Sequence, residues 1–156
     1  MVLAACGFTP AYAPGGSGMA LQNMVLAAEP HEKAAFDLVE RLEERLGPSD
    51  SPKYGLSYKI NLKPVGVAIT TDNAITRYNL IGVVDWELTD VTTGTRLTGG
   101  RAENFTSYSA TGSTVAGLAA QEDAAQRLMR IIADQIVSQL LATSGQWIVA
   151  SGASVE

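Results

Sequence analysis

Two long stretches of alternating apolar and polar residues restrict the fold more than any other feature of the chain. In the first, residues 54–63, the apolar positions are Tyr54, Leu56, Tyr58, Ile60 and Leu62. In the second, residues 78–88, they are Tyr78, Leu80, Val84, Trp86 and Leu88. A period of two is typical of a strand with one buried face and one wet face. We therefore expect a sheet that is apolar on one side only.

The first stretch changes phase at a proline. After Pro64 the apolar positions are Val65, Val67 and Ile69, which continue the alternation one residue out of step. Because proline cannot donate to a strand ladder, we expect a bulge at Lys63-Pro64.

Turn residues divide the rest of the sheet. Residues 71–73 and 90–94 are predicted turns, the second with Gly94 in the left-handed conformation. A fourth strand is expected from Arg96 to about Tyr108, in which Gly99-Gly100 would leave room for the Trp86 indole. A short apolar run over residues 20–27 predicts the first strand.

Two amphipathic helices are expected. The first begins with Pro30 at its first helical position and ends at Gly47-Pro48, with Asp37 and Arg41 as an i,i+4 pair on its wet face. The second runs from Thr114 to about Leu141, with Gly145 as its closing residue. Its predicted core stripe is Leu118, Ala125, Leu128, Met129, Ile132, Ile136 and Leu140.

This order of elements predicts an α+β fold. We expect a two-layer sandwich, with a four-stranded, mostly antiparallel sheet and two helices on one face, in the order β-α-β-β-β-α. At 156 residues the chain has the length of one domain. We interpret residues 1–5 as a signal-peptide remnant, 6–19 as a lipidated flexible tether, 20–145 as the domain and 146–156 as a C-terminal tail.

The sequence offers little catalytic chemistry. It contains no metal-ligand spacing, phosphate loop or nucleophile elbow, and it predicts no cofactor, no metal and no catalytic residue. Asp85 and Glu87 share one strand face and could serve a hydrolase, but cross-strand pairing is the simpler interpretation. It places Lys59 near Asp85 or Glu87. It also places Arg101 near Asp85, and Arg96 near Asp90.

This pairing leaves Lys63 and Arg77 without a partner on the polar side of the hairpin. They are our candidates for contacts with an anionic ligand, with Lys59 and Lys53 as helpers; the alternative is that they are merely solvated. The net charge of −5 argues against a nucleic-acid partner, which requires a basic surface.

The only cysteine lies in Leu3-Ala4-Ala5-Cys6-Gly7, which reads as a bacterial lipobox. Cleavage before Cys6 would let its thiol carry a diacylglyceryl group, so that acyl chains hold the protein on a membrane. Gly7 favours the outer membrane over retention in the inner membrane. The charged and apolar regions of a signal peptide do not precede the motif. A buried structural cysteine is the alternative.

Several passages together carry a family resemblance: Cys6 to Tyr12, the hairpin from Tyr78 through Asp90 to Gly94, Ser107-Tyr108-Ser109, Ala119 to Glu122, and Ile132 to Ile136. They resemble the lipopolysaccharide-assembly lipoproteins, the LptE or rare lipoprotein B family. By charge, Lys63 and Arg77 fit the phosphate-bearing glycolipid that this resemblance implies as a ligand. The resemblance implies a non-enzymatic lipoprotein, anchored on the periplasmic side of the outer membrane. It would partner and plug the β-barrel lipopolysaccharide translocon and contact lipopolysaccharide itself. The alternative is a stand-alone periplasmic lipoprotein that binds a small ligand or a cell-wall component.

Overall fold

The two alternating stretches form the central strands of a four-stranded sheet. The computed structural model describes residues 17–150. Its elements are α1 (Ser17–Leu21), β1 (Val25–Ala27), α2 (Lys33–Leu46), β2 (Tyr54–Ile69), β3 (Ile75–Asp90), β4 (Arg96–Ser109) and α3 (Thr114–Ala150). The strand order is β1-β2-β3-β4; β1 is parallel to β2, and the other neighbours are antiparallel.

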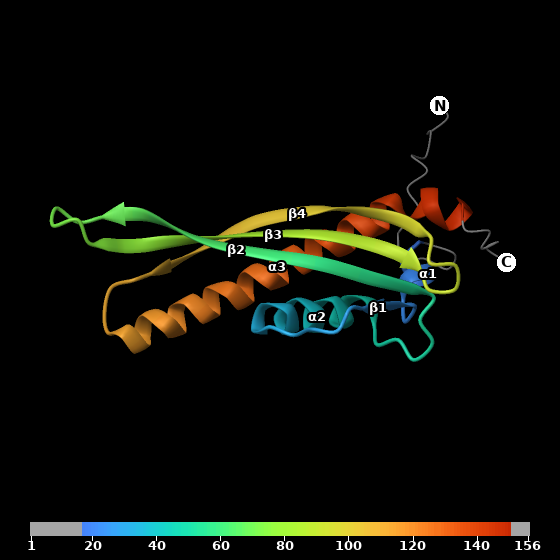
Figure 1. Cartoon of the computed structure of the whole chain (residues 1–156), viewed down its shortest axis with the longest axis horizontal. Coiled ribbons are helices and arrows are strands. Elements are labelled where there is room, and N and C mark those ends of the chain that lie inside the picture. Colours follow the sequence, from blue (N-terminus) through green and yellow to red (C-terminus); the bar gives the residue numbers. More distant parts are fainter. Residues whose placement is uncertain (1–16, 151–156) are drawn as a thin grey trace, which may run out of the picture.

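Both long helices cover the same face of this sheet (Figure 1). In β3 the buried hydrophobic residues are Leu80, Val84, Trp86 and Leu88, which alternate as the sequence predicted. Their odd-numbered neighbours point away from the helices and form the outer face of the sheet. The predicted α+β sandwich with two helices on one face is confirmed.

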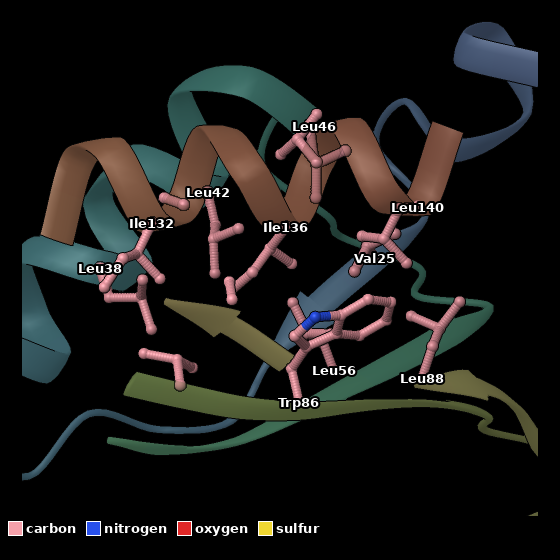
Figure 2. Close-up of a cluster of buried hydrophobic side chains, with 14 of the residues drawn as sticks. Val25, Leu38, Leu42, Leu46, Leu56, Trp86, Leu88, Ile132, Ile136 and Leu140 are labelled. Carbon is pink, nitrogen blue, oxygen red and sulfur yellow. The ribbon is translucent and has the colours of Figure 1, made fainter. Parts of the chain in front are cut away.

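The core lies between α3 and the sheet. Leu128, Ile132, Ile136 and Leu140 of α3 have no exposed area. The Trp86 indole lies in this layer (Figure 2) and donates its Nε1–H to Gln139 Oε1 at 2.9 Å. Gly100 is opposite Trp86, and a Cβ at Gly100 would stand 3.1 Å from Cζ2 of the indole. The glycine therefore leaves the room that the sequence predicted.

The end of α3 differs from the prediction. The helix continues through Gly145, which was expected to close it, and runs to Ala150. Trp147 is 3% exposed, and its ring meets the Tyr54 ring edge-on at 5.2 Å. The last turns stay helical because they complete the core at this end of the sheet. Residues 146–150 are thus not part of a tail.

The N-terminal strand is shorter than predicted. Residues 20–27 do not form one strand, because Ser17–Leu21 is helical and only Val25–Ala27 pairs with β2. The predicted tether of residues 6–19 overlaps the start of α1, and Leu21 at the end of this helix is fully buried in the core. Residues 6–16 lie outside the described part of the chain.

The first long helix begins three residues after Pro30. Glu32, with extended backbone angles, is its N-cap, and α2 starts at Lys33. The preceding segment is held along β2 instead, since Ala28 N–H donates to Leu56 O at 2.8 Å and the Tyr58 hydroxyl donates to Ala28 O at 3.0 Å. The predicted stop at Gly47 is confirmed, with a φ of 79° at that residue.

No bulge is found at Lys63-Pro64. Pro64 pairs in register with Leu80, and the register shifts only farther along, between Gly66 and Ala68 and between Ala68 and Ile69. Val91 N–H donates to Lys53 O, so odd-numbered residues of β2 turn their backbone groups toward β3. Pro64 therefore faces the open edge of the sheet, where its missing N–H costs no ladder hydrogen bond.

The predicted Asp37–Arg41 pair does not form. Asp37 is 6% exposed and accepts from Lys33 at 3.2 Å. Arg41 instead reaches across to α3, where it donates to both carboxylate oxygens of Asp134 at 3.1 and 3.0 Å, and Arg45 adds a third bond at 2.9 Å. These bonds join the two helices above the apolar layer.

Because the last turns of α3 belong to the core, Trp147→Ala should lower the free energy of unfolding by about 3–5 kcal/mol, the cost of removing a buried aromatic ring. Gly145→Ala is the matched control in the same turn. No atom lies within 4 Å of its new Cβ, so it should raise stability, by about 0.5–1 kcal/mol. Urea unfolding followed by circular dichroism measures both. A Trp147→Ala variant as stable as the parent would contradict this packing.

Candidate functional site

The positive charges divide into two groups. Seven of the eleven lysines and arginines form ion pairs with described carboxylates. Among the described residues, the four cations without an ion pair are Lys53, Lys59, Lys63 and Arg77, which we call the unpaired cations. They are the same four side chains that the sequence proposed as glycolipid contacts.

Three of the unpaired cations lie on the outer face of the sheet. Lys59 and Lys63 are four residues apart on β2, opposite Asp85 and Ile81 of β3. Arg77 lies on β3, four residues before Ile81. At the rise of a strand, each step of four residues is roughly 13 Å. The cations are therefore spaced along the sheet instead of forming one cluster.

Two of the four have weaker partners. The Lys53 ammonium stands 5.6 Å from the centre of the Tyr54 ring, and Lys59 faces the Asp85 carboxylate across the strands. Within the described chain, no side-chain hydrogen bond, ion pair or ring contact engages Lys63 or Arg77. The row between them contains Asn79 and Ser107, whose side chains share a hydrogen bond of 2.7 Å.

An exposed apolar strip adjoins Lys63. In the register of the sheet, Lys63, Ile81 and Phe105 form one row across three strands. Phe105 is 57% exposed. A cation beside an exposed aromatic ring offers an amphipathic ligand both charge and apolar surface.

The paired carboxylates are occupied by arginines. Arg101 donates to both oxygens of Asp85 at 2.8 and 3.2 Å, and Arg96 pairs with Glu87 at 2.7 Å. The Arg101 guanidinium lowers the pKa of Asp85. An exposed carboxylate held ionised in this way is poorly suited to general acid–base work near neutral pH.

One of the predicted pairs was wrong. Arg96 was expected near Asp90, but its side chain lies over Gly99, where a Cβ would come within 2.5 Å of the guanidinium. The missing side chain lets Arg96 reach Glu87. Asp90 instead accepts the backbone N–H groups of Thr92 and Thr93, both at 2.9 Å, and shapes the turn.

Sequence reasoning missed a groove on the helix side of the sheet. It has a volume of about 450 Å³ and is lined by the stacked rings of Tyr78 and Tyr108 and by the first turns of α3. The register that places Arg101 opposite Asp85 also places Tyr108 opposite Tyr78, so their pairing could have been found from the sequence. Leu118, predicted in the core stripe, lines this groove and is 57% exposed, because no second helix covers it there.

Other site types are not found among the described residues. No group of three or more histidine, cysteine or acidic side chains there could hold a metal ion. No described helix combines the length and the hydropathy needed to cross a bilayer. Cys6 lies outside residues 17–150, so its acylation stays a prediction.

The fold has counterparts among solved structures. A protein of Caulobacter crescentus described as a lipoprotein is similar with a TM-score of 0.73 and 21% identity, over 86% of this chain and 99% of that one. The rare lipoprotein B of Shewanella oneidensis has a TM-score of 0.60 and 14% identity, over 77% and 93%. A lipoprotein B of Nitrosomonas europaea has 0.59 and 12%, over 81% and 87%. No curated protein was found to match the sequence.

The architecture is therefore that of small α+β lipoproteins. The model of the LptE family, described as lipopolysaccharide-assembly, matches residues 24–140. The chain belongs to the LptE family. The match begins just before β1 and ends within α3, so it spans every strand of the sheet.

The effect of Arg101 on the titration of the Asp85 carboxyl can be tested. Arg101→Gln should raise the pKa of Asp85 toward its ordinary value, because the main group favouring the carboxylate is lost. In the parent protein the pKa of Asp85 is lowered. The stability that the pair contributes is therefore present near neutral pH and is lost as acidification protonates Asp85. Carboxyl carbon shifts followed by NMR measure the titration. Arg127→Gln, on a helix surface, is the control; equal Asp85 titration in both variants would contradict the pairing.

Proposed function

We propose that this protein is a lipid-anchored lipoprotein of the outer membrane that partners and plugs a large β-barrel in lipopolysaccharide assembly. We propose also that the outer face of its sheet contacts lipopolysaccharide. The observation that carries the proposal is the family match, which covers residues 24–140. The family supplies the process, and the surface of the sheet supplies the candidate contacts.

The body has the properties that a plug requires. Its buried apolar residues lie between the sheet and the helices, and the outer face, apart from the strip of Ile81 and Phe105, presents mainly charged and polar side chains. The lumen of a barrel of the porin type is polar and wet, so such a face can lie against it without losing an apolar interface.

The proposed anchor would act from one end of the molecule. Cys6 precedes Ser17 by eleven residues, which span at most roughly 40 Å when fully extended. In Figure 1, α1 lies beside the C-terminal end of α3, and the hairpin between β2 and β3 lies at the opposite end. A tether would keep the body at a high local concentration near a membrane partner while the hairpin points away from the anchor.

We propose a non-catalytic role. Asp85 and Glu87, the carboxylates that a hydrolase would use, are paired with arginines on an open sheet surface. The only histidine, His31, lies between β1 and α2, and no cysteine is present among the described residues to form a catalytic pair with it. These placements support a binding and assembly function over a hydrolytic one.

Lys63 and Arg77 are the proposed contacts for the phosphate groups of lipopolysaccharide. Binding an anion at either residue breaks no ion pair with a described side chain. The exposed Phe105, in the row of Lys63, adds apolar area for the lipid part of such a ligand. Lys59 and Lys53, which have weaker partners, are proposed to assist.

The double variant Lys63→Ala with Arg77→Ala should weaken lipopolysaccharide binding at low salt by roughly tenfold or more, because it removes two charges that have no other partner. The loss should shrink as salt is added. Surface plasmon resonance at several salt concentrations measures it.

The matched control is Arg127→Ala with Arg130→Ala, which removes the same net charge from two exposed ion pairs on helices. This control should change affinity by less than about twofold. Equal weakening by both double variants would show that net charge, and not this face of the sheet, determines binding.

A further inference from the structure

The groove between the hairpin and the start of α3, which we call the distal groove, exists because one helix layer ends before the sheet does. α2 has 14 residues and α3 has 37, lengths of about 21 and 55 Å. Figure 1 shows that only α3 continues beneath the hairpin end of the sheet. The groove's walls include Pro64, Tyr78 and Tyr108 from the sheet, and Gly117, Leu118 and Gln121 from α3.

The lining of the distal groove is neutral and half polar. No charged side chain lines it. The Tyr78 and Tyr108 rings stack with their centres 5.4 Å apart and their planes at 15°. Burial raises the pKa of Tyr108, and a tyrosine is a neutral phenol at pH 7 even at its ordinary pKa. The two rings therefore line the same groove as Thr114, which has a hydroxyl group, and Gln121, which has an amide.

Gly117 keeps the groove open. It lies inside α3, where glycine costs roughly 1 kcal/mol relative to alanine. No atom lies within 4 Å of the place its Cβ would occupy, so no packing contact explains the glycine. A side chain at this position would project into the groove.

We propose that the distal groove binds a neutral saccharide unit, the sugar portion of the glycolipid whose phosphates meet Lys63 and Arg77. This inference rests on the proposed function. The apolar face of a sugar ring can pack on the tyrosine rings. Its hydroxyl groups can form hydrogen bonds with Thr114 and Gln121. An acyl chain would bury those polar groups without partners, and the neutral lining offers nothing to a charged ligand.

The edges of the sheet disfavour a peptide strand in this place. A strand that joins β2 needs backbone donors along the open edge, and Pro64, on the groove wall, has none. On the other edge, Asn104 Oδ1 already accepts the Phe105 N–H at 2.8 Å. Strand addition beside the groove is therefore blocked on the β2 side and hindered on the β4 side.

The groove and the cations lie at the same level of the hairpin. Lys63 precedes Pro64, and Arg77 precedes Tyr78, and successive strand residues point to opposite faces. The open edge of β2 lies between the two faces. One glycolipid can therefore pass around this edge, with phosphate on the outer face and sugar in the groove.

The test uses a neutral oligosaccharide of hexoses that carries neither phosphate nor carboxylate groups. NMR titration of the full chain should shift the ring signals of Tyr78 and Tyr108. Gly117→Trp, which fills the groove, should weaken this binding by roughly tenfold or more, whereas Gly117→Ala should leave most of it. Circular dichroism melting of both variants verifies that the fold is kept.

The outcomes separate this inference from the proposed function. Lys63→Ala with Arg77→Ala should leave binding of the neutral oligosaccharide unchanged while weakening intact lipopolysaccharide. If intact lipopolysaccharide binds through the two cations but the oligosaccharide does not bind, the groove is not a sugar site and the proposed function stands. Oligosaccharide binding that Gly117→Trp does not affect would also overturn the inference. The inference would also be overturned if peptides of a barrel partner, but not the sugar, shifted the ring signals of Tyr78 and Tyr108.

Discussion

The packing of α3 against the apolar face of the sheet is the interaction on which the rest of the structure depends. β3 and β4 bury their inner side chains against this helix. α2 adds Leu38, Leu42 and Leu46 to the same core, and its Arg41 and Arg45 bind Asp134 of α3. Trp86 is fixed between the two layers (Figure 2) by its hydrogen bond to Gln139. Since all these contacts lie on one side of the sheet, neither long helix covers its outer face.

The same arrangement gives the molecule two different ends. At the end where α3 finishes, α1, Tyr54 and Trp147 close the core, and a tether from Cys6 would begin beside them. At the other end the sheet extends past α2 and is backed by α3 alone. The first end supplies stability, and the second supplies open surface on both faces of the sheet. A lipoprotein that must hold one position and bind at another benefits from this separation.

Much of this fold could be predicted from the sequence because strands with one wet face have a period that is local and strict. The same alternation placed Lys63 and Arg77 on one face. The errors arose where distant contacts override local signals. Gly145 reads as a helix end, but the burial of Trp147 against Tyr54 continues the helix. Pro64 reads as a break, but its backbone faces an edge. The distal groove depends on how far α3 extends along the sheet beyond α2, which no local sequence pattern predicts.

The central proposal is that the protein acts while anchored to the membrane and bound to a large β-barrel of lipopolysaccharide assembly. The most direct test is purification of the exported, C-terminally tagged protein from detergent-solubilised outer membranes, with Cys6→Ser as the matched variant. We predict that a large outer-membrane β-barrel protein co-purifies in near-equal amount with the parent, that its recovery falls with Cys6→Ser, and that the parent's mass shows acylation at Cys6. A parent protein that is recovered from the membrane without any barrel would contradict the account.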